Sequence, residues 1–288
     1  MVATFISLAA ALRALVVVIV LLGASIIVSG ILGPLGFVGL VTWLLLLGGI
    51  AVGLFLLVRA GNPMAAAGMI LMPFSTWLAF SVQPPAFVWT GLFFIGAFLI
   101  TRGVSADTPL KSSWPITLLR VVVGWAWVDN AQDHFLTNWV PDGGGALQAA
   151  TASANRAPLW FGDPAYQGFL KGVVVPNGGR WAALLICGEL AFGLLMAMGV
   201  FTPVAAIGLL VQSTNYILSK GLIAHGAYSD KTFFAVDLVC LIVMAGLAYG
   251  LDATLRRHVP SSLARTLMGV GGAEVEPVPQ AQTRPQPA

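Results

Sequence analysis

The residue with the clearest chemical potential is Glu189, a single carboxylate near the middle of the apolar run 181–200. A charged group in a lipid bilayer is costly unless it faces the protein interior or a water-filled cavity, so an intramembrane carboxylate indicates a functional site. Neighbouring apolar runs contain further polar groups: Arg120, Asp129 and Asp133 in 114–136, Gln212 and Tyr216 in 203–219, and Asp237 in 231–250.

The depth of these groups places several of them at one level of the membrane. With alternate spans running in opposite directions and a rise of about 1.5 Å per residue, Glu189 lies roughly 12 to 14 Å below the outer surface and Asp237 roughly 9 Å. Gln212 and Tyr216 fall in the outer half of their span, and Asp129 lies toward the outer end of its own. We therefore predict one polar pocket that opens outward.

The predicted pocket combines acid–base groups with flat aromatic walls. The residues expected to act catalytically are Glu189, Asp129, Asp237 and Arg120, whose long side chain would climb from a deeper level. The residues expected to bind a ring-shaped ligand by stacking and hydrogen bonding are Trp125, Trp127, Asp133, Gln212 and Tyr216. Purely structural roles are the alternative: an Arg120–Glu189 pair that only holds helices together, solvated aspartates at a helix end, and an Asp237 bonded only to the next helix.

The composition is that of a membrane protein. Hydrophobic residues make up 58% of the 288 residues and charged residues only 9%, whereas a soluble domain has about 25% charged residues. Eight apolar runs have the length that spans a bilayer: 10–32, 37–59, 63–82, 86–103, 114–136, 181–200, 203–219 and 231–250. The cations lie in loops and the tail, which predicts cytoplasmic N- and C-termini and gives no sign of nucleic-acid binding.

An internal repeat organises the chain. When the sequence is shifted by 140 residues, 48–71 aligns with 188–211 and eight of 24 positions are identical. We therefore predict an all-α integral membrane protein with eight transmembrane helices, arranged as two tandem four-helix bundles of the same orientation. Residues 1–105 form the first unit, 106–256 the second, and 257–288 a disordered cytoplasmic tail. Gly49 stands where the second unit has Glu189, so the first unit is expected to be a degenerate scaffold.

The connection 137–180 is long for a structureless loop, which suggests a function or a folded cap. Its aromatic residues either anchor it at the membrane surface or roof the pocket: Trp139, Trp160, Phe161 and Tyr166. Cys187 and Cys240 lie in predicted spans and are expected to pack as small apolar residues. No two of the three histidines form a spaced pair on one helix, so neither a haem nor a metal site is expected.

Several short motifs in residues 114–256 resemble the DoxX/DoxD family of small membrane proteins. They are Leu119-Arg120 with Gly124-Trp125, Gly188-Glu189-Leu190 with Gly193-Leu194, Gly199-Val200-Phe201-Thr202-Pro203-Val204-Ala205-Ala206, and Ala245-Gly246 with Gly250-Leu251-Asp252. The DoxD-like branch is the most similar, because Val175-Pro176-Asn177 precedes the glutamate helix. The chain departs from the family pattern at 129–133, where family members usually show Gly and Lys, and in its added N-terminal unit.

The resemblance implies a membrane subunit of a redox complex, similar to the thiosulfate:quinone oxidoreductase subunit that passes electrons to quinone. Quinone is then the expected substrate, and the sequence gives no fingerprint for haem, flavin or a metal. Expected partners are membrane lipid and either the other proteins of a redox complex or further copies of the chain, in the plasma membrane of a prokaryote. The alternatives are a non-catalytic membrane anchor in a larger respiratory or redox complex and a small transporter.

Overall fold

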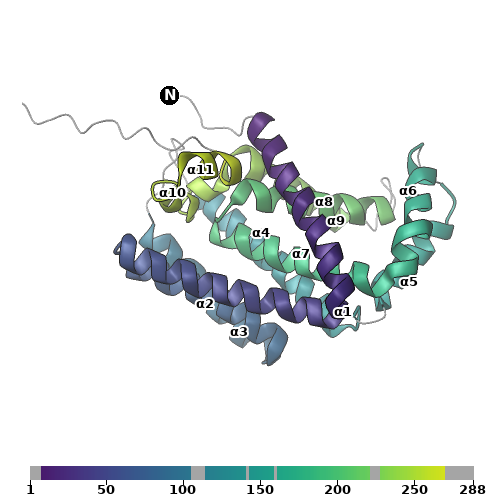
Figure 1. Ribbon diagram of the computed structural model, residues 1–288, viewed down its shortest axis with the longest axis horizontal. Helices are drawn as coiled ribbons and strands as arrows, with labels where there is room; N and C mark the ends of the chain where they lie inside the picture. The colour runs from purple at the N-terminus through teal and green to yellow at the C-terminus, as the bar shows by residue number, and fades with distance from the viewer. Residues whose placement is uncertain (1–7, 105–113, 141–142, 159–160, 221–227, 270–288) are drawn as a thin grey trace, which may run out of the picture.

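The computed structural model describes residues 8–104, 114–140, 143–158, 161–220 and 228–269. Within these residues the chain forms helices and turns and no strand (Figure 1). The all-α prediction is confirmed.

Helix α1 (Leu8–Arg59) bends sharply at Gly33, and its two arms correspond to the first two predicted spans. Gly33 has φ 73° and ψ 165°, a conformation that only glycine adopts readily. Pro34 follows directly and supplies no backbone N–H to continue the helix ladder. The sequence Gly33-Pro34 therefore separates the two arms, which diverge in direction (Figure 1).

The second arm of α1 packs against α2 (Pro63–Ser81), and α2 packs against α3 (Ala86–Gly103). The first arm lies elsewhere: Ala14 and Val18 are fully buried in a core shared with Val204 and Ala205 of the second unit. A grouping into two separate four-helix bundles is therefore not confirmed, because the first arm of α1 covers helices of the second unit.

The second unit contains α4 (Trp114–Leu136), α7 (Gly178–Met198), α8 (Thr202–Lys220) and α9 (Tyr228–Ile242). Helix α9 ends well before the predicted boundary at residue 250, because Met244 adopts a left-handed conformation with φ 49°. A 3₁₀ turn η4 (Ala245–Leu247) and two short helices, α10 (Asp252–Leu255) and α11 (Ser261–Leu267), complete the described chain.

The long connection between α4 and α7 is folded. It contains α5 (Gly144–Asn155), α6 (Asp163–Phe169), a π-helical turn η1 (Leu170–Val174) and a 3₁₀ turn η2 (Val175–Asn177) that leads into α7. We call residues 143–177 the cap. It forms one end of the molecule (Figure 1).

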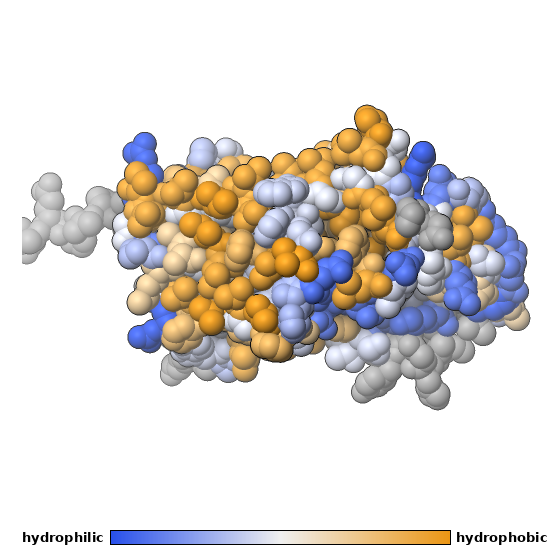
Figure 2. Space-filling view, turned by 90° about the horizontal axis from the view of Figure 1, so that it is seen from below, coloured by the Kyte–Doolittle hydropathy of each residue, from blue (hydrophilic) through white to orange (hydrophobic). Residues whose placement is uncertain are grey.

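Among the described residues, four helical stretches are long and apolar enough to cross a membrane: Leu8–Arg59, Pro63–Ser81, Ala86–Gly103 and Asp163–Met198. The count of eight spans stays a prediction, since α4, α8 and α9 are not among these stretches. Helix α4 contains three charged residues and α9 has only 15 residues. Figure 2 shows a mainly hydrophobic middle, with hydrophilic residues gathered most strongly at the end formed by the cap.

Candidate functional site

Glu189 is completely buried and is the acceptor at the centre of a hydrogen-bonded cluster. Asn130 Nδ2 donates to its Oε1 over 2.8 Å, and the Tyr216 hydroxyl donates to the same oxygen over 2.6 Å. His134 Nδ1 lies 3.0 Å from Oε2. Asn130 and His134 share one face of α4 because they are four residues apart. We call these four residues the cap-end cluster; they join α4, α7 and α8.

The His134 ring is held in place on both sides. It stacks on Trp139, with ring centroids 3.6 Å apart and planes 18° apart, while Nδ1 faces the carboxylate. Its other nitrogen, Nε2, has no hydrogen-bond partner among the described residues, and the side chain is 12% exposed. An imidazole fixed at one nitrogen and open at the other can accept a proton from a ligand or donate one to it.

A cavity of about 240 Å³ lies between the cap and the cap-end cluster. Glu189 lies behind the wall, and Asn130, His134 and Tyr216 present the cluster to the cavity. Four aromatic side chains line it: Trp139, Tyr166, Trp181 and Tyr216. The walls are otherwise mostly small or apolar, including Leu170 and Val174 of the π-helical turn. A flat, partly polar ring suits such a space.

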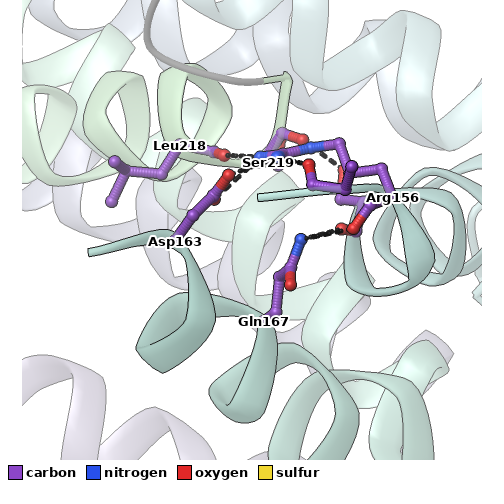
Figure 3. A network of polar contacts seen from close by, with 7 residues as sticks. Arg156, Asp163, Gln167, Leu218 and Ser219 are labelled. Atoms are coloured by element: carbon purple, nitrogen blue, oxygen red, sulfur yellow. Dashed lines mark hydrogen bonds and ion pairs between the residues drawn. The ribbon is translucent and has the colours of Figure 1, made fainter. Parts of the chain in front are cut away.

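An ion pair inside the cap holds the arginine that fastens the cap to the end of α8. Arg156 pairs with Asp163, which is fully buried, and donates to the Leu218 carbonyl over 3.1 Å. Gln167 donates to the carbonyls of Ser153 and Arg156 over 3.2 and 3.0 Å (Figure 3). These contacts explain why a long connection keeps a fixed position over the cavity.

A second contact between cap and α8 lies in the cavity wall. The Tyr166 hydroxyl donates to the side-chain oxygen of Asn215 over 2.8 Å. At the opening, Lys220 pairs with Asp230 of α9 over 2.8 Å. The aromatic residues Trp139 and Tyr166 therefore follow the pocket-roof alternative, whereas Phe161 is 96% exposed and Trp160 lies outside the described residues.

Asp237 occupies a separate site between α9, α4 and α8. It is fully buried, and its Oδ2 accepts from Trp127 Nε1 over 3.3 Å and from Ser213 Oγ over 3.4 Å. Its Oδ1 has no partner among the described residues. Neither Asp237 nor Trp127 lines the cavity at Glu189.

Arg120 lies at the opposite end of α4 from the cavity, contrary to the prediction that it reaches Glu189. Its guanidinium lies beside Gly199 and Gly250, where an added Cβ would collide with Nη1, and donates a long 3.5 Å hydrogen bond to the Tyr249 carbonyl. Asp252 lies nearby. The backbone of these glycines holds the side chain at this level, so it does not extend toward the cap.

Asp252 closes the turn between α7 and α8. It is buried and accepts from the N–H groups of Phe201 and Thr202 over 2.7 and 3.0 Å, and from the Thr202 hydroxyl over 2.8 Å. Burial raises the pKa of its carboxyl to about 6. We call Arg120, Thr202 and Asp252 the turn-end cluster. The Asp252 carboxylate lies at the N-terminus of α8, where carboxylates are favourable.

The remaining predicted site residues are not in the cavity wall. Asp129 and Asp133 are exposed on another face of α4. Trp125 packs against Phe94 of α3, with ring centroids 5.7 Å apart. Gln212 is buried beside Gly188 and donates to the Leu185 carbonyl over 3.3 Å. Of the predicted residues, the structure thus brings Glu189 and Tyr216 together at the cavity.

The family model described as "TQO small subunit DoxD" matches residues 115–275. The chain belongs to the DoxD family. A search of curated proteins and a search of solved structures found no match. The DoxD match covers both polar clusters and the cap, and the predicted family is confirmed. Together with the apolar helices, it indicates a membrane protein in a lipid environment; the orientation of the termini and the type of cell stay predictions.

Within this DoxD unit the sequence analysis missed Asn130, His134 and Trp181. The available signal was the spacing of Asn130 and His134, which places an amide and an imidazole on one helix face. A pattern of two histidines on one helix does not detect this arrangement, because His134 pairs with a carboxylate. Among the described residues, no group of three or more His, Cys, Asp and Glu side chains is placed to hold a metal ion.

Proposed function

We propose that this chain is the quinone-binding membrane subunit of a complex of the thiosulfate:quinone oxidoreductase type. The observation that supports this most directly is the cap-end cluster at the wall of an aromatic-lined cavity of about 240 Å³. The DoxD match supports it independently, since "TQO" in the family description denotes that oxidoreductase.

The cavity offers what a quinone ring needs. Its flat π-system would stack on indole or phenol rings of the wall, and its carbonyl oxygens would accept hydrogen bonds. His134 lines the cavity while its Nδ1 stays on Glu189. In this arrangement the imidazolium form of His134 would donate to a carbonyl, and Glu189 would stabilise its charge.

The chemistry balances with thiosulfate as the reductant. Two thiosulfate anions form one S–S bond to give tetrathionate and release two electrons, which partner proteins would pass to the quinone. The quinone takes these two electrons and two protons to become the quinol. In the proposed mechanism His134 gives each proton from Nε2 and is reprotonated from water at the opening near Lys220 and Asp230, while Glu189 keeps the imidazole in position.

The test is quinone reduction by the purified complex containing Glu189→Gln. The amide keeps the size of the side chain but removes the negative charge that faces His134. We expect turnover to fall at least about tenfold, roughly 1.4 kcal/mol of barrier, while assembly is unchanged. Asp129→Asn is the matched control, because it neutralises an exposed carboxylate one position from Asn130, and it should leave turnover unchanged.

The opposite result is equally informative. Unchanged turnover in an intact Glu189→Gln complex would remove the cap-end cluster from the reaction. The chain would then be a membrane anchor for partner subunits. A loss of turnover in Asp129→Asn alone would indicate that the reaction takes place at the exposed face of α4.

A further inference from the structure

An apolar groove of about 450 Å³ runs along the seam between α4 and α9. Its lining is almost entirely hydrophobic on the α4 side and mixed near the start of α9: Leu119, Val122, Val123, Ala126, Ser229, Thr232, Phe233 and Val236. Val122 is 42% exposed, so the groove is open on its outer side. In a membrane this opening faces lipid.

The groove lies close to the cavity along the same two helices. On α4, Asn130 lines the cavity and Ala126, one turn earlier, lines the groove. On α9, Asp230 lines the cavity, while its neighbour Ser229 and then Phe233 line the groove. A ligand with its ring in the cavity and a chain leaving between α4 and α9 would therefore pass from polar to apolar surroundings within about one helical turn.

The inner wall of the groove keeps polar atoms away from such a chain. Trp127 and Phe233 pack with ring centroids 5.1 Å apart, and Trp127 is 2% exposed. The Trp127 indole N–H is turned to Asp237, whose carboxylate also accepts from Ser213. The polar group behind the seam is thus bonded inward, and hydrocarbon side chains line the groove except at Ser229 and Thr232.

We infer that the groove between α4 and α9 binds the isoprenoid tail of the quinone whose ring occupies the cavity. The inference rests on the proposed function and adds the route by which the substrate enters from the bilayer. Burial of a hydrocarbon chain is favourable when the chain is removed from water, but a chain arriving from lipid gains little by transfer. The groove therefore acts mainly by fixing the direction from which the ring enters.

The test compares a tailed and a tailless ring in nanodiscs that contain the full chain. The probes are decylubiquinone and the same dimethoxy-methyl-benzoquinone ring without the chain, followed by quenching of indole fluorescence from the cavity tryptophans. Ala126→Phe fills the groove from α4, and Val236→Phe fills it from α9. Leu118→Phe, at a 64% exposed position on α4 outside the groove, is the matched control.

We expect both groove variants to bind decylubiquinone at least about tenfold more weakly and the tailless ring within about twofold of the unmodified chain. The control should bind both probes normally. Equal effects on the two probes, or no effect on either, would overturn the inference. If the groove variants weaken the binding of decanol and of decylubiquinone equally, and the tailless ring does not bind, the groove is a lipid-chain site instead.

The two proposals fail in different ways. Absence of tailless-ring binding to the unmodified chain counts against the quinone site itself. Tailless-ring binding that is normal in every variant, together with unchanged decylubiquinone binding in Ala126→Phe, leaves the quinone site in place and removes only the tail groove.

Discussion

The cap-end cluster joins α4, α7 and α8 near the cap, and the turn-end cluster joins α4, α8 and α10 at the opposite end of α4 and α8. Each has a fully or almost fully buried carboxylate that accepts several hydrogen bonds: Glu189 in one and Asp252 in the other. Their surroundings differ. Three partners of Glu189 line a cavity, whereas Asp252 is closed in by the backbone of the turn between α7 and α8.

This difference separates a site from a structural support better than depth or burial does. Asp252 accepts from two backbone N–H groups that would otherwise be orphaned at the start of α8. Its hydrogen-bonding capacity is therefore used by the fold. At the other end, His134 Nε2 has no hydrogen-bond partner among the described residues, and the His134 side chain lines the cavity. In the turn-end cluster, Nε and Nη1 of Arg120 also lack partners among the described residues, but Arg120 does not line the cavity. The cap-end cluster therefore has hydrogen-bonding capacity beside a space that a ligand can occupy.

The largest effect should come from breaking the turn-end cluster. Arg120→Met keeps most of the buried volume but leaves the Asp252 carboxylate without its nearby cation. We expect the free energy of unfolding to fall by about 3 kcal/mol, because a buried carboxylate then lacks a compensating charge nearby, and this should appear as a lower apparent melting temperature in detergent. The double variant Arg120→Met with Asp252→Asn should lose less than the sum of the two single changes.

Strict additivity in that cycle would mean that Arg120 and Asp252 do not interact. A second result is expected: the Arg120→Met chain that remains folded should bind the tailless quinone ring as the unmodified chain does. Loss of ring binding in that folded fraction would show that the two clusters act together as one functional unit.

The sequence predicted the positions of most helices. They followed from the apolar runs and from helix-breaking residues such as Gly33-Pro34. Helices α2 and α3 end within one residue of the predicted boundaries. Helix α9 was predicted to end too late, because no sequence pattern indicates the left-handed conformation of Met244. Membership of the DoxD family was also accessible from short motifs.

The site was predicted only in part because depth along a helix says nothing about direction around it. Asp129 and Asn130 are neighbours in sequence, but a step of about 100° separates their side chains on α4. One is exposed, and the other donates to Glu189. Trp139 and Tyr166 were recognised as alternatives for a pocket roof, yet their placement depends on how the cap folds, through Arg156 and Asp163.

A smaller effect should appear in the pH dependence of stability. The pKa of Asp252 is about 6 in the folded chain and about 3.9 when unfolded. Between these values the folded chain binds more protons, so stability is highest at low pH and falls as pH rises through about 6. From about pH 5 to about pH 7 the contribution of Asp252 to the loss of stability is on the order of 1 kcal/mol, and Asp252→Asn should remove that contribution.

Melting curves of the two proteins at both pH values measure this slope. Glu189→Gln is the matched comparison from the other cluster and should keep the slope of the unmodified chain. A slope that persists in Asp252→Asn but vanishes in Glu189→Gln would assign the proton-linked stability to the cap-end cluster and reverse the comparison.

The smallest effect is expected from Tyr216→Phe, which tests whether the cap-end cluster is tuned for a ligand. The change removes the 2.6 Å hydrogen bond to Glu189 Oε1, while Asn130 still donates to that oxygen. Stability should therefore change by no more than about 1 kcal/mol, the net value of one hydrogen bond. Quinone turnover should fall about fivefold, roughly 1 kcal/mol, because the carboxylate that orients His134 is then held by fewer donors. A loss of stability as large as in Arg120→Met, with unchanged turnover of the folded fraction, would make Tyr216 a structural support like Thr202. The cap-end cluster would then differ from the turn-end cluster only through His134 and the cavity that it lines.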